Sequence, residues 1–289
     1  MFHLHRAERT DVLADALAQV LATPLPDPMT TEIVSVPAPG VERWLHQRLA
    51  TRLGTSQGHD GVAANLDFTS PARLSDRVLG GAERFLDGAV ATGVSAAERW
   101  RPGAMTWPVL RVLDTLIDDP RLAVLARHVG AGGDTDDHRR GRRYATARQI
   151  ADLFDSYGRQ RPAMLTAWAA GEDTDGIGAP VPEDLGWQPD FWRAVRREIG
   201  QAHPAERLAE HCAVLREHHD ATDLPERLSV FGPTRITESM LEVLAAVSAH
   251  RDVHLFVPHP SPALWDTLAP LAADGAAGGR RRADNPPPR

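Results

Sequence analysis

The sequence predicts an α/β protein in which a parallel β-sheet is interrupted by a large helical insertion. Near the N-terminus, short apolar segments and amphipathic segments alternate in the order strand, helix, strand, helix, which is typical of a parallel sheet with crossover helices. Between residues 75 and 225 apolar residues recur at helical spacing instead, and strand patterns return only after that stretch.

The first strands and helices are predicted between residues 1 and 54. MFHLH and TEIVSVPAPG are the strand segments, whereas TDVLADALAQVLAT and VERWLHQRLATRLG carry apolar residues at helical spacing. Thr10 is the expected N-cap of the first helix, and Gly54 is the expected C-cap of the second.

The middle of the chain is predicted to be almost wholly helical. Its helices are expected at residues 75–88, 105–118, 120–129, 145–158, 162–169, 188–200 and 204–218. Strands return at RLSVFGP and DVHLFVPHP, on either side of the helix TESMLEVLAAVSAH, whose expected N-cap is Thr237. We therefore predict one discontinuous α/β domain from residues 1–74 and 226–270, interrupted by a helical domain from residues 75–225.

The C-terminal segment has a different composition. Residues 271–289 are rich in Ala, Gly, Arg and Pro and cannot bury a core, so we expect a disordered or truncated tail. The four predicted strands are fewer than the roughly five or six of an average sheet. We therefore expect the chain to be the front part of a longer protein.

Composition limits the chemistry of the chain. It contains no lysine, which excludes the P-loop lysine, Schiff bases and lysine general bases. Cys212 has no second cysteine to pair with, so disulfides and cysteine-rich zinc sites are excluded and we predict a buried core position for it. The net charge of -7 argues against non-specific coating of DNA but does not exclude a local arginine-lined surface. Without a long apolar run or a signal peptide pattern, a cytoplasmic protein is expected.

The strand-to-helix junctions lack the features of a nucleotide site. Phosphate loops use glycine backbone amides and a lysine at such junctions. The first junction, HLHRAERTDVL, has neither glycine nor lysine, and the second, VPAPGVERW, has one glycine without a following Lys-Ser/Thr pair. We therefore predict no ATP site, no catalytic residues and no cofactor in this chain.

Two polar segments are candidate metal sites. EHCAVLREHHD offers His211 and His218 on one helix face, and a free-standing metal-dependent hydrolase that uses this region is the alternative function. No H-E-x-x-H spacing is present, so we favour solvated residues at a helix end and predict no metal site. DTDDHRRGRR, at residues 134–143, lacks the glycine and glutamate of a calcium loop, and we interpret it as a self-neutralising loop.

Residues 147–162, ARQIADLFDSYGRQRP, combine an apolar and a charged stripe on one predicted helix. The apolar residues follow the i, i+3, i+4, i+7 pattern of a buried face: Ile150, Leu153, Phe154 and Tyr157. The charged residues form two i,i+4 pairs on the opposite stripe: Arg148 with Asp152, and Asp155 with Arg159. Such pairs are worth about 0.2–0.5 kcal/mol each. Periodicity leaves a salt-bridged solvent face and a DNA-facing surface as alternatives.

Several segments do not follow from generic α/β patterning. The most specific are GVAANLDF, ADLFD followed by RP and W, and HLFVPHP, and SVPAPGVERWLHQRLATRLG and MTWPVLRVL accompany them. Their order and spacing resemble the N-terminus of the exodeoxyribonuclease V gamma subunit (RecC) family. The resemblance runs from about residue 2 to about residue 266, and members of that family are several times longer.

The resemblance implies a fold and a role. Members of the family begin like the first motor domains of a superfamily 1 helicase, with an α/β domain that carries a helical insertion and has lost its ATP site. The subunit is non-catalytic and assembles with the beta and alpha subunits of exodeoxyribonuclease V, in which ATP and Mg²⁺ would act. It splits forked duplex DNA and threads the 3′-ended strand through a tunnel where the recombination hotspot Chi is read, during double-strand break repair.

The resemblance also assigns residues to the tunnel wall. Four positions that match the family's motif would face single-stranded DNA or the latch that closes behind it: Asp152, Leu153, Asp155 and Arg161. Arginine can stack on bases or pair with phosphate, and a carboxylate can accept from an exocyclic amine. After ANLDF the family uses an apolar and then an aromatic residue, whereas this chain has Ser70 and Asp76 at the aligned positions.

Overall fold

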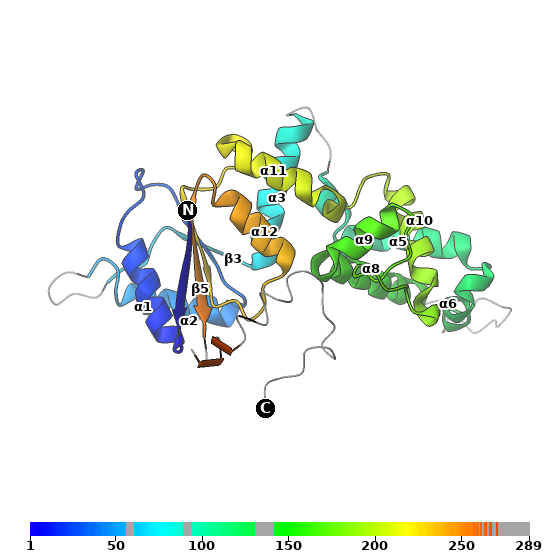
Figure 1. The fold of residues 1–289 in the computed structure, drawn as a ribbon, viewed down its shortest axis with the longest axis horizontal. Helices are drawn as coiled ribbons and strands as arrows, with labels where there is room; N and C mark the ends of the chain where they lie inside the picture. Colours follow the sequence, from blue (N-terminus) through cyan, green and yellow to red (C-terminus); the bar gives the residue numbers. More distant parts are fainter. Residues whose placement is uncertain are drawn as a thin grey trace. The chain divides into compact units, whose positions relative to one another are not determined.

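The computed structural model describes residues 1–55, 61–88, 94–130 and 142–259, together with residues 261, 263, 264, 266, 267 and 270. The chain divides into two compact units, Met1–Ala82 with Cys212–Arg289, and Glu83–His211. The first unit contains the sheet and the second is helical (Figure 1). Their boundaries fall inside two helices, α3 (Pro71–Asp87) and α11 (Leu208–Glu217).

The sheet has five strands, all parallel, in the order β1-β5-β4-β2-β3. The strands are β1 (Phe2–Ala7), β2 (Glu32–Ser35), β3 (Leu66–Thr69), β4 (Arg227–Phe231) and β5 (Asp252–Pro258). The predicted number of four was wrong because β3 was not recognised as a strand. It is four residues long at an edge of the sheet, too short for an alternating pattern to stand out.

The two ends of the chain interleave within the sheet. Strands β4 and β5, from the end of the sequence, lie between β1 and β2 from its beginning, so the sheet cannot form from either part alone. The register pairs Ile33 with Leu228 and Leu4 with Leu255. Strands with helices on both faces are buried on both sides, which explains why all five residues of β4 are buried.

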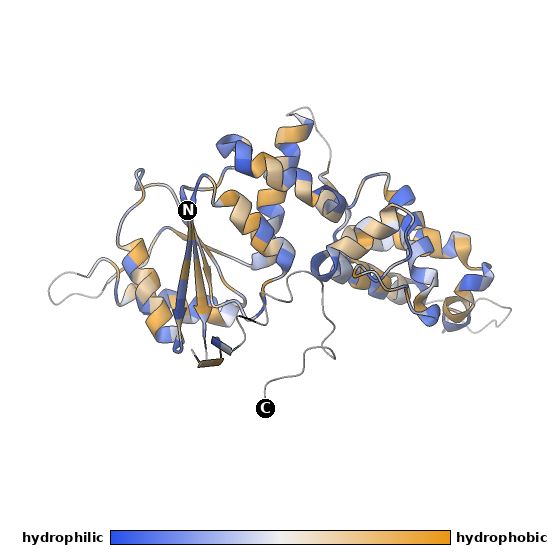
Figure 2. Cartoon of the chain, in the orientation of Figure 1, coloured by the Kyte–Doolittle hydropathy of each residue, from blue (hydrophilic) through white to orange (hydrophobic). Residues whose placement is uncertain are grey.

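Helices cover both faces of the sheet. α1 (Thr10–Leu21) and α2 (Pro39–Ala50) lie on one side and α12 (Glu238–Val247) on the other (Figure 1). The core under α1 and α2 joins residues from helices and strands: Leu13, Leu17, Val34, Leu45, Leu49, Phe231 and Phe256. Hydrophobic and hydrophilic residues alternate along α1 and α12, as expected of helices with one buried face (Figure 2).

The structure tests three predicted helix caps. Thr237 caps α12 as predicted, because its hydroxyl oxygen accepts a hydrogen bond from the Met240 N–H at 3.2 Å. Thr10 is instead the first residue of α1, after an extended Arg9. Gly54 does not end α2, which stops at Ala50, although its φ of 63° shows a left-handed turn four residues later.

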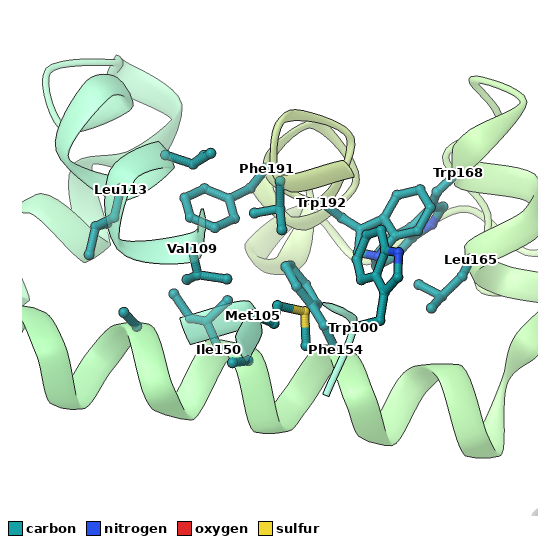
Figure 3. Packing of buried hydrophobic residues seen from close by; sticks show 14 of the residues in the cluster. Trp100, Met105, Val109, Leu113, Ile150, Phe154, Leu165, Trp168, Phe191 and Trp192 are labelled. Carbon is teal, nitrogen blue, oxygen red and sulfur yellow. The ribbon is translucent and has the colours of Figure 1, made fainter. Parts of the chain in front are cut away.

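The helical unit packs around an aromatic-rich core (Figure 3). The α-helices described wholly within it are α4 (Ala96–Arg99), α5 (Pro102–Leu116), α6 (Ala123–His128), α8 (Arg142–Gln160), α9 (Pro162–Ala169) and α10 (Trp187–Ile199). The predicted helix 120–129 begins with a 3₁₀ turn, η1 (Pro120–Leu122), and the predicted helix 204–218 begins with another, η3 (Pro204–Arg207). Among the residues that the structure describes, no helix is long and apolar enough to cross a membrane.

Candidate nucleic-acid interface

α8 is held in place by a buried stripe on one side. Ala147, Ile150, Ala151 and Phe154 are buried and face the core residues of α5 and α10 (Figure 3). Ile150 and Phe154 thus confirm the predicted apolar stripe, whereas Leu153 and Tyr157 are only partly buried. The helix is therefore fixed by its inner face, which leaves the opposite face available to contact another molecule.

Tyr157 secures the C-terminal end of α8. Its hydroxyl donates a hydrogen bond of 3.0 Å to the side-chain oxygen of the buried Gln188, and its ring meets the Trp168 ring edge-on at 5.9 Å. One residue later, a Cβ on Gly158 would lie 2.6 Å from Cε1 of the buried His203. Only glycine fits this contact without displacing the histidine ring, so the end of α8 is closely packed.

The charged stripe of α8 is formed in part. Asp155 pairs with Arg159 across one turn of the helix, as predicted. The predicted pair of Arg148 with Asp152 does not form; both side chains are exposed and bond to none of the described residues. In water an exposed pair gains little and loses side-chain entropy, which accounts for its absence. Asp152 and Arg148 are therefore free to meet a ligand.

Arg161 lies between two helices. It is exposed, has φ -141° and ψ 56°, and caps α9, whose first residue is Pro162. Its N–H donates to the Tyr157 carbonyl at 2.7 Å and its carbonyl accepts from the Met164 N–H at 3.0 Å. Because a residue before proline avoids helical dihedrals, Pro162 ends α8 and turns Arg161 outward. The backbone is thus held at both sides while the guanidinium remains exposed.

Three of the predicted site residues span a broad arc of α8. At about 100° per residue, Leu153 and Asp155 lie about 160° apart around the helix axis, with Asp152 between them. Asp152 is exposed, whereas Leu153 and Asp155 are partly buried at the two margins of this arc. A strand that contacts all three would therefore approach α8 over Asp152. Carboxylates in that position can accept hydrogen bonds from exocyclic base amines.

Two exposed aromatic residues near this face were not recognised from the sequence. Trp107 on α5 and Tyr144 on α8 have ring centroids 5.7 Å apart. MTWPVLRVL contributed only to the family resemblance, and RRY was hidden in a polar loop pattern. Helical periodicity could have indicated that Trp107 is exposed, because it falls on the side of the helix opposite the buried Met105 and Val109.

The segment after ANLDF, at which the family uses an apolar and then an aromatic residue, lies in the sheet unit. Ser70 precedes α3, and its hydroxyl oxygen accepts a hydrogen bond from the Arg73 N–H at 3.3 Å. Asp76 lies within α3 and is partly buried. Ser70 therefore has a structural explanation as the residue that begins the helix.

The first strand-to-helix junction is filled by the chain's own charged residues. Asp11 Oδ1 accepts hydrogen bonds from the Val12 N–H and from Arg9 Nε, each at 3.0 Å. The Arg9 guanidinium holds the pKa of the Asp11 carboxyl below its usual range. A carboxylate in the first turn of α1 thus occupies the helix end where a nucleotide-binding domain would bind phosphate.

The histidines of the alternative metal site differ in their surroundings. His211 is only 3% exposed, so the predicted solvated position was wrong; it belongs to the inward face of α11. Among the described residues neither of its ring nitrogens has a hydrogen-bond partner. Burial, and then Arg207, lower the pKa of His211 to about 4. His218 is exposed.

The described part of the chain contains no group of three or more His, Cys, Asp or Glu side chains arranged to hold a metal ion. Cys212 is buried, as predicted, and burial raises the pKa of its thiol. The acidic loop at residues 134–141 lies outside the described residues. Of its arginine-rich end, Arg143 pairs with Asp114 at 2.7 Å and Arg142 is exposed.

Comparison with known proteins identifies relatives along almost the whole chain. The model of the RecC N-terminal domain matches residues 2–284. The RecBCD enzyme subunit RecC of Mycolicibacterium smegmatis is 45% identical over 92% of this chain, and that of Mycobacterium tuberculosis is 45% identical over 94%. The Escherichia coli subunit of the same name is 25% identical over 93% of the chain.

The match covers only part of each relative. The chain spans 22% of the length of the M. smegmatis and E. coli proteins and 24% of the M. tuberculosis protein. The matched residues include both structural units, because they extend from β1 through the helical unit to β5. This chain therefore belongs to the RecC family and carries its N-terminal domain.

Proposed function

We propose that this chain is the N-terminal part of a non-catalytic, DNA-channelling and Chi-scanning subunit of an exodeoxyribonuclease V complex. The observation that carries the proposal is the match of the RecC N-terminal domain over residues 2–284. Relatives that match 92% to 94% of the chain bear the name RecBCD enzyme subunit RecC. On this proposal the protein binds the beta and alpha subunits and acts with them in recombinational repair of double-strand breaks.

The sheet unit would be a helicase-like domain that no longer binds ATP. A parallel sheet with helices on both faces is consistent with that origin. At the β1–α1 junction, Asp11 takes the position in which phosphate would need a positive environment, and Arg9 is committed to Asp11 rather than to a ligand. In this proposal the energy for DNA movement comes from ATP and Mg²⁺ in the partner subunits.

The helical unit would supply part of the path of the single strand. Asp152 and Arg161 are exposed, and neither side chain bonds to another residue in the described ranges. Arg161 can pair with a phosphate or stack on a base, and Asp152 can accept a hydrogen bond from a base amine. Leu153 would add an apolar contact at the margin of the same surface.

Assembly is tested by co-expression of the full-length protein with its cognate beta and alpha subunits. Affinity capture of a tagged beta subunit is expected to recover this protein in a stoichiometric complex that unwinds duplex DNA ends when ATP and Mg²⁺ are present. A beta subunit that captures only the alpha subunit, with this protein left soluble and unbound, would refute the proposed role.

The proposed DNA path predicts a separation of function from stability. In the reconstituted complex, Asp152→Asn and Arg161→Ala are expected to alter single-strand binding and Chi-dependent pausing. Because both side chains are exposed, the free energy of unfolding should change by no more than about 0.5 kcal/mol. Strand cleavage patterns and urea unfolding measure the two effects.

Matched controls come from exposed residues outside α8 and α9. Asp184→Asn and Arg127→Ala remove the same charges from exposed positions in the same unit. They should leave both the cleavage pattern and the stability unchanged. Equal effects of the control and test variants would show that net charge, rather than a defined path, determines DNA handling.

A further inference from the structure

Trp107 and Tyr144 form an exposed aromatic pair on the helical unit. Trp107 is 56% exposed and Tyr144 48% exposed, while their ring centroids lie 5.7 Å apart with an angle of 49° between the rings. Both rings thus keep a large part of their surface in water although they touch each other. Exposed large aromatics of this kind are enriched where a protein binds another molecule.

The pair is not part of the core. At about 100° per residue, Trp107 lies on the side of α5 opposite Met105 and Val109, which are fully buried. Tyr144 precedes the buried stripe of α8, which starts at Thr146 and Ala147. The core therefore does not require either ring, and their exposure needs another explanation.

The arginines around the pair differ in whether their charge is neutralised. Arg143 bonds to Asp114 at 2.7 Å, and Arg111 bonds to Glu198 at 2.5 Å. Arg142 and Arg148 are exposed and make no ion pair or side-chain hydrogen bond within the described ranges. Around the axis of α8, Arg148 lies about 40° from Tyr144 and Arg142 about 160° from it. One free guanidinium group, that of Arg148, thus lies on the same side as the aromatic pair, which favours an anionic ligand with flat apolar groups.

The pair also aligns with the proposed DNA path. Tyr144, Arg148 and Asp152 follow one another at i, i+4 and i+8, so they lie along one side of α8. Eight residues of helix rise about 12 Å, and stacked bases are about 3.4 Å apart, so this distance corresponds to about three to four stacked nucleotides or about two extended ones. A strand that passes Asp152 would therefore reach Tyr144 within a few nucleotides.

We propose that Trp107 and Tyr144 form a base-stacking platform for single-stranded DNA, with Arg148 binding an adjacent phosphate. The inference rests on the proposed function, because it extends the strand path of α8 to a second contact. Single-stranded nucleic acid presents flat bases and phosphates at alternating positions, which matches aromatic rings beside an arginine. A protein partner of ordinary interface size would need a larger apolar area than two rings supply.

The test uses the complex of the full-length protein with its beta and alpha subunits. An oligonucleotide that carries 5-iododeoxyuridine is bound and irradiated, and the crosslinked peptides are identified by mass spectrometry. The iodinated base is placed at successive positions along the oligonucleotide. One position is expected to crosslink near Asp152, and a position a few nucleotides away is expected to crosslink to Trp107 or Tyr144. Trp107→Ala and Tyr144→Ala should each weaken binding of the oligonucleotide about 5- to 100-fold.

Conservative and distant variants serve as controls. Trp107→Phe and Tyr144→Phe keep an aromatic face and should retain most of the affinity and the crosslinks. Val124→Ala truncates another exposed apolar residue of the helical unit and should have no effect. The melting temperature of each variant, measured by circular dichroism, identifies loss of folding. An alanine variant that folds and still binds and crosslinks like the unmodified complex overturns the platform.

The remaining outcomes separate this inference from the proposed function. Crosslinks near Asp152 that are lost in Arg161→Ala, with none at the aromatic pair, would overturn the platform and leave the proposed path intact. Absence of crosslinks to both regions would refute the proposed path and the platform together. Loss of subunit assembly in Trp107→Ala, without any crosslink at the pair, would assign the surface to a protein partner and overturn the inference.

Discussion

Replacing Arg227 with alanine should lower the free energy of unfolding of the sheet unit by about 3–5 kcal/mol. The Arg227 and Glu32 side chains are only 11% and 13% exposed and form an ion pair between positions 195 residues apart in the sequence. Arg227 also donates to the carbonyls of Val20 and Thr23 at 2.9 Å and 2.8 Å. The substitution would leave Glu32 charged, buried and unpaired, which is the main cost. Urea unfolding followed by circular dichroism measures it.

Two comparisons isolate the buried pair. The double variant Arg227→Met with Glu32→Leu removes both charges and should recover much of the lost stability, because the uncompensated carboxylate is gone. Arg77→Ala removes an exposed arginine that bonds to Asp223 at 3.1 Å, and should cost less than about 1 kcal/mol. If Arg227→Ala and Arg77→Ala lowered stability equally, the ion pair would not hold the two parts of the sheet together.

The predictable part of the fold was the part with strong periodicity. α9 was predicted at its observed bounds, since Pro162 begins it and an apolar run continues from there. Parallel pairing followed from the alternation of strands and helices, and the burial of all of β4 and of the four residues Val253–Phe256 in β5 agrees with it. Strand order was not predictable, because local patterns do not reveal that β5 pairs with β1 across more than 240 residues.

Errors arose where tertiary contacts decide the outcome. His211 was assigned to water because of its polar neighbours, yet the helix turns it inward beside Cys212. Thr10 has the side chain of an N-cap, but Asp11 bonds to the Val12 N–H and α1 begins at Thr10 itself. The four proposed DNA contacts came from the family resemblance, and periodicity could indicate only that Asp152 is exposed.

Acidification should destabilise the protein through its buried histidines. Burial lowers the pKa of His203, His211 and His254 to about 4, against an ordinary value of 6.5. As pH falls through 6.5, the unfolded chain binds protons on these histidines while the folded chain does not, so stability is lost between about pH 6.5 and 4. Between pH 7 and 5, linkage gives a loss of about 2 kcal/mol for each such histidine.

His203 provides the sharpest test of this loss. Its ring packs edge-on against Trp100 at 4.7 Å, and its Nδ1 accepts a hydrogen bond from the Ala205 N–H at 3.0 Å, so the ring is neutral in the folded protein. Glu206 raises the pKa, but burial outweighs it. His203→Gln should lower stability at pH 7 yet reduce its dependence on pH by about 2 kcal/mol between pH 7 and 5.

The control for this effect is the exposed His128→Gln, which should leave the slope of stability against pH unchanged. Urea midpoints measured between pH 7 and 5 avoid the range in which most carboxylates bind protons. If His203→Gln kept the original slope, the proton uptake would belong to other groups. In that case the packing of the ring against Trp100 would stabilise the helical unit without making it sensitive to acid.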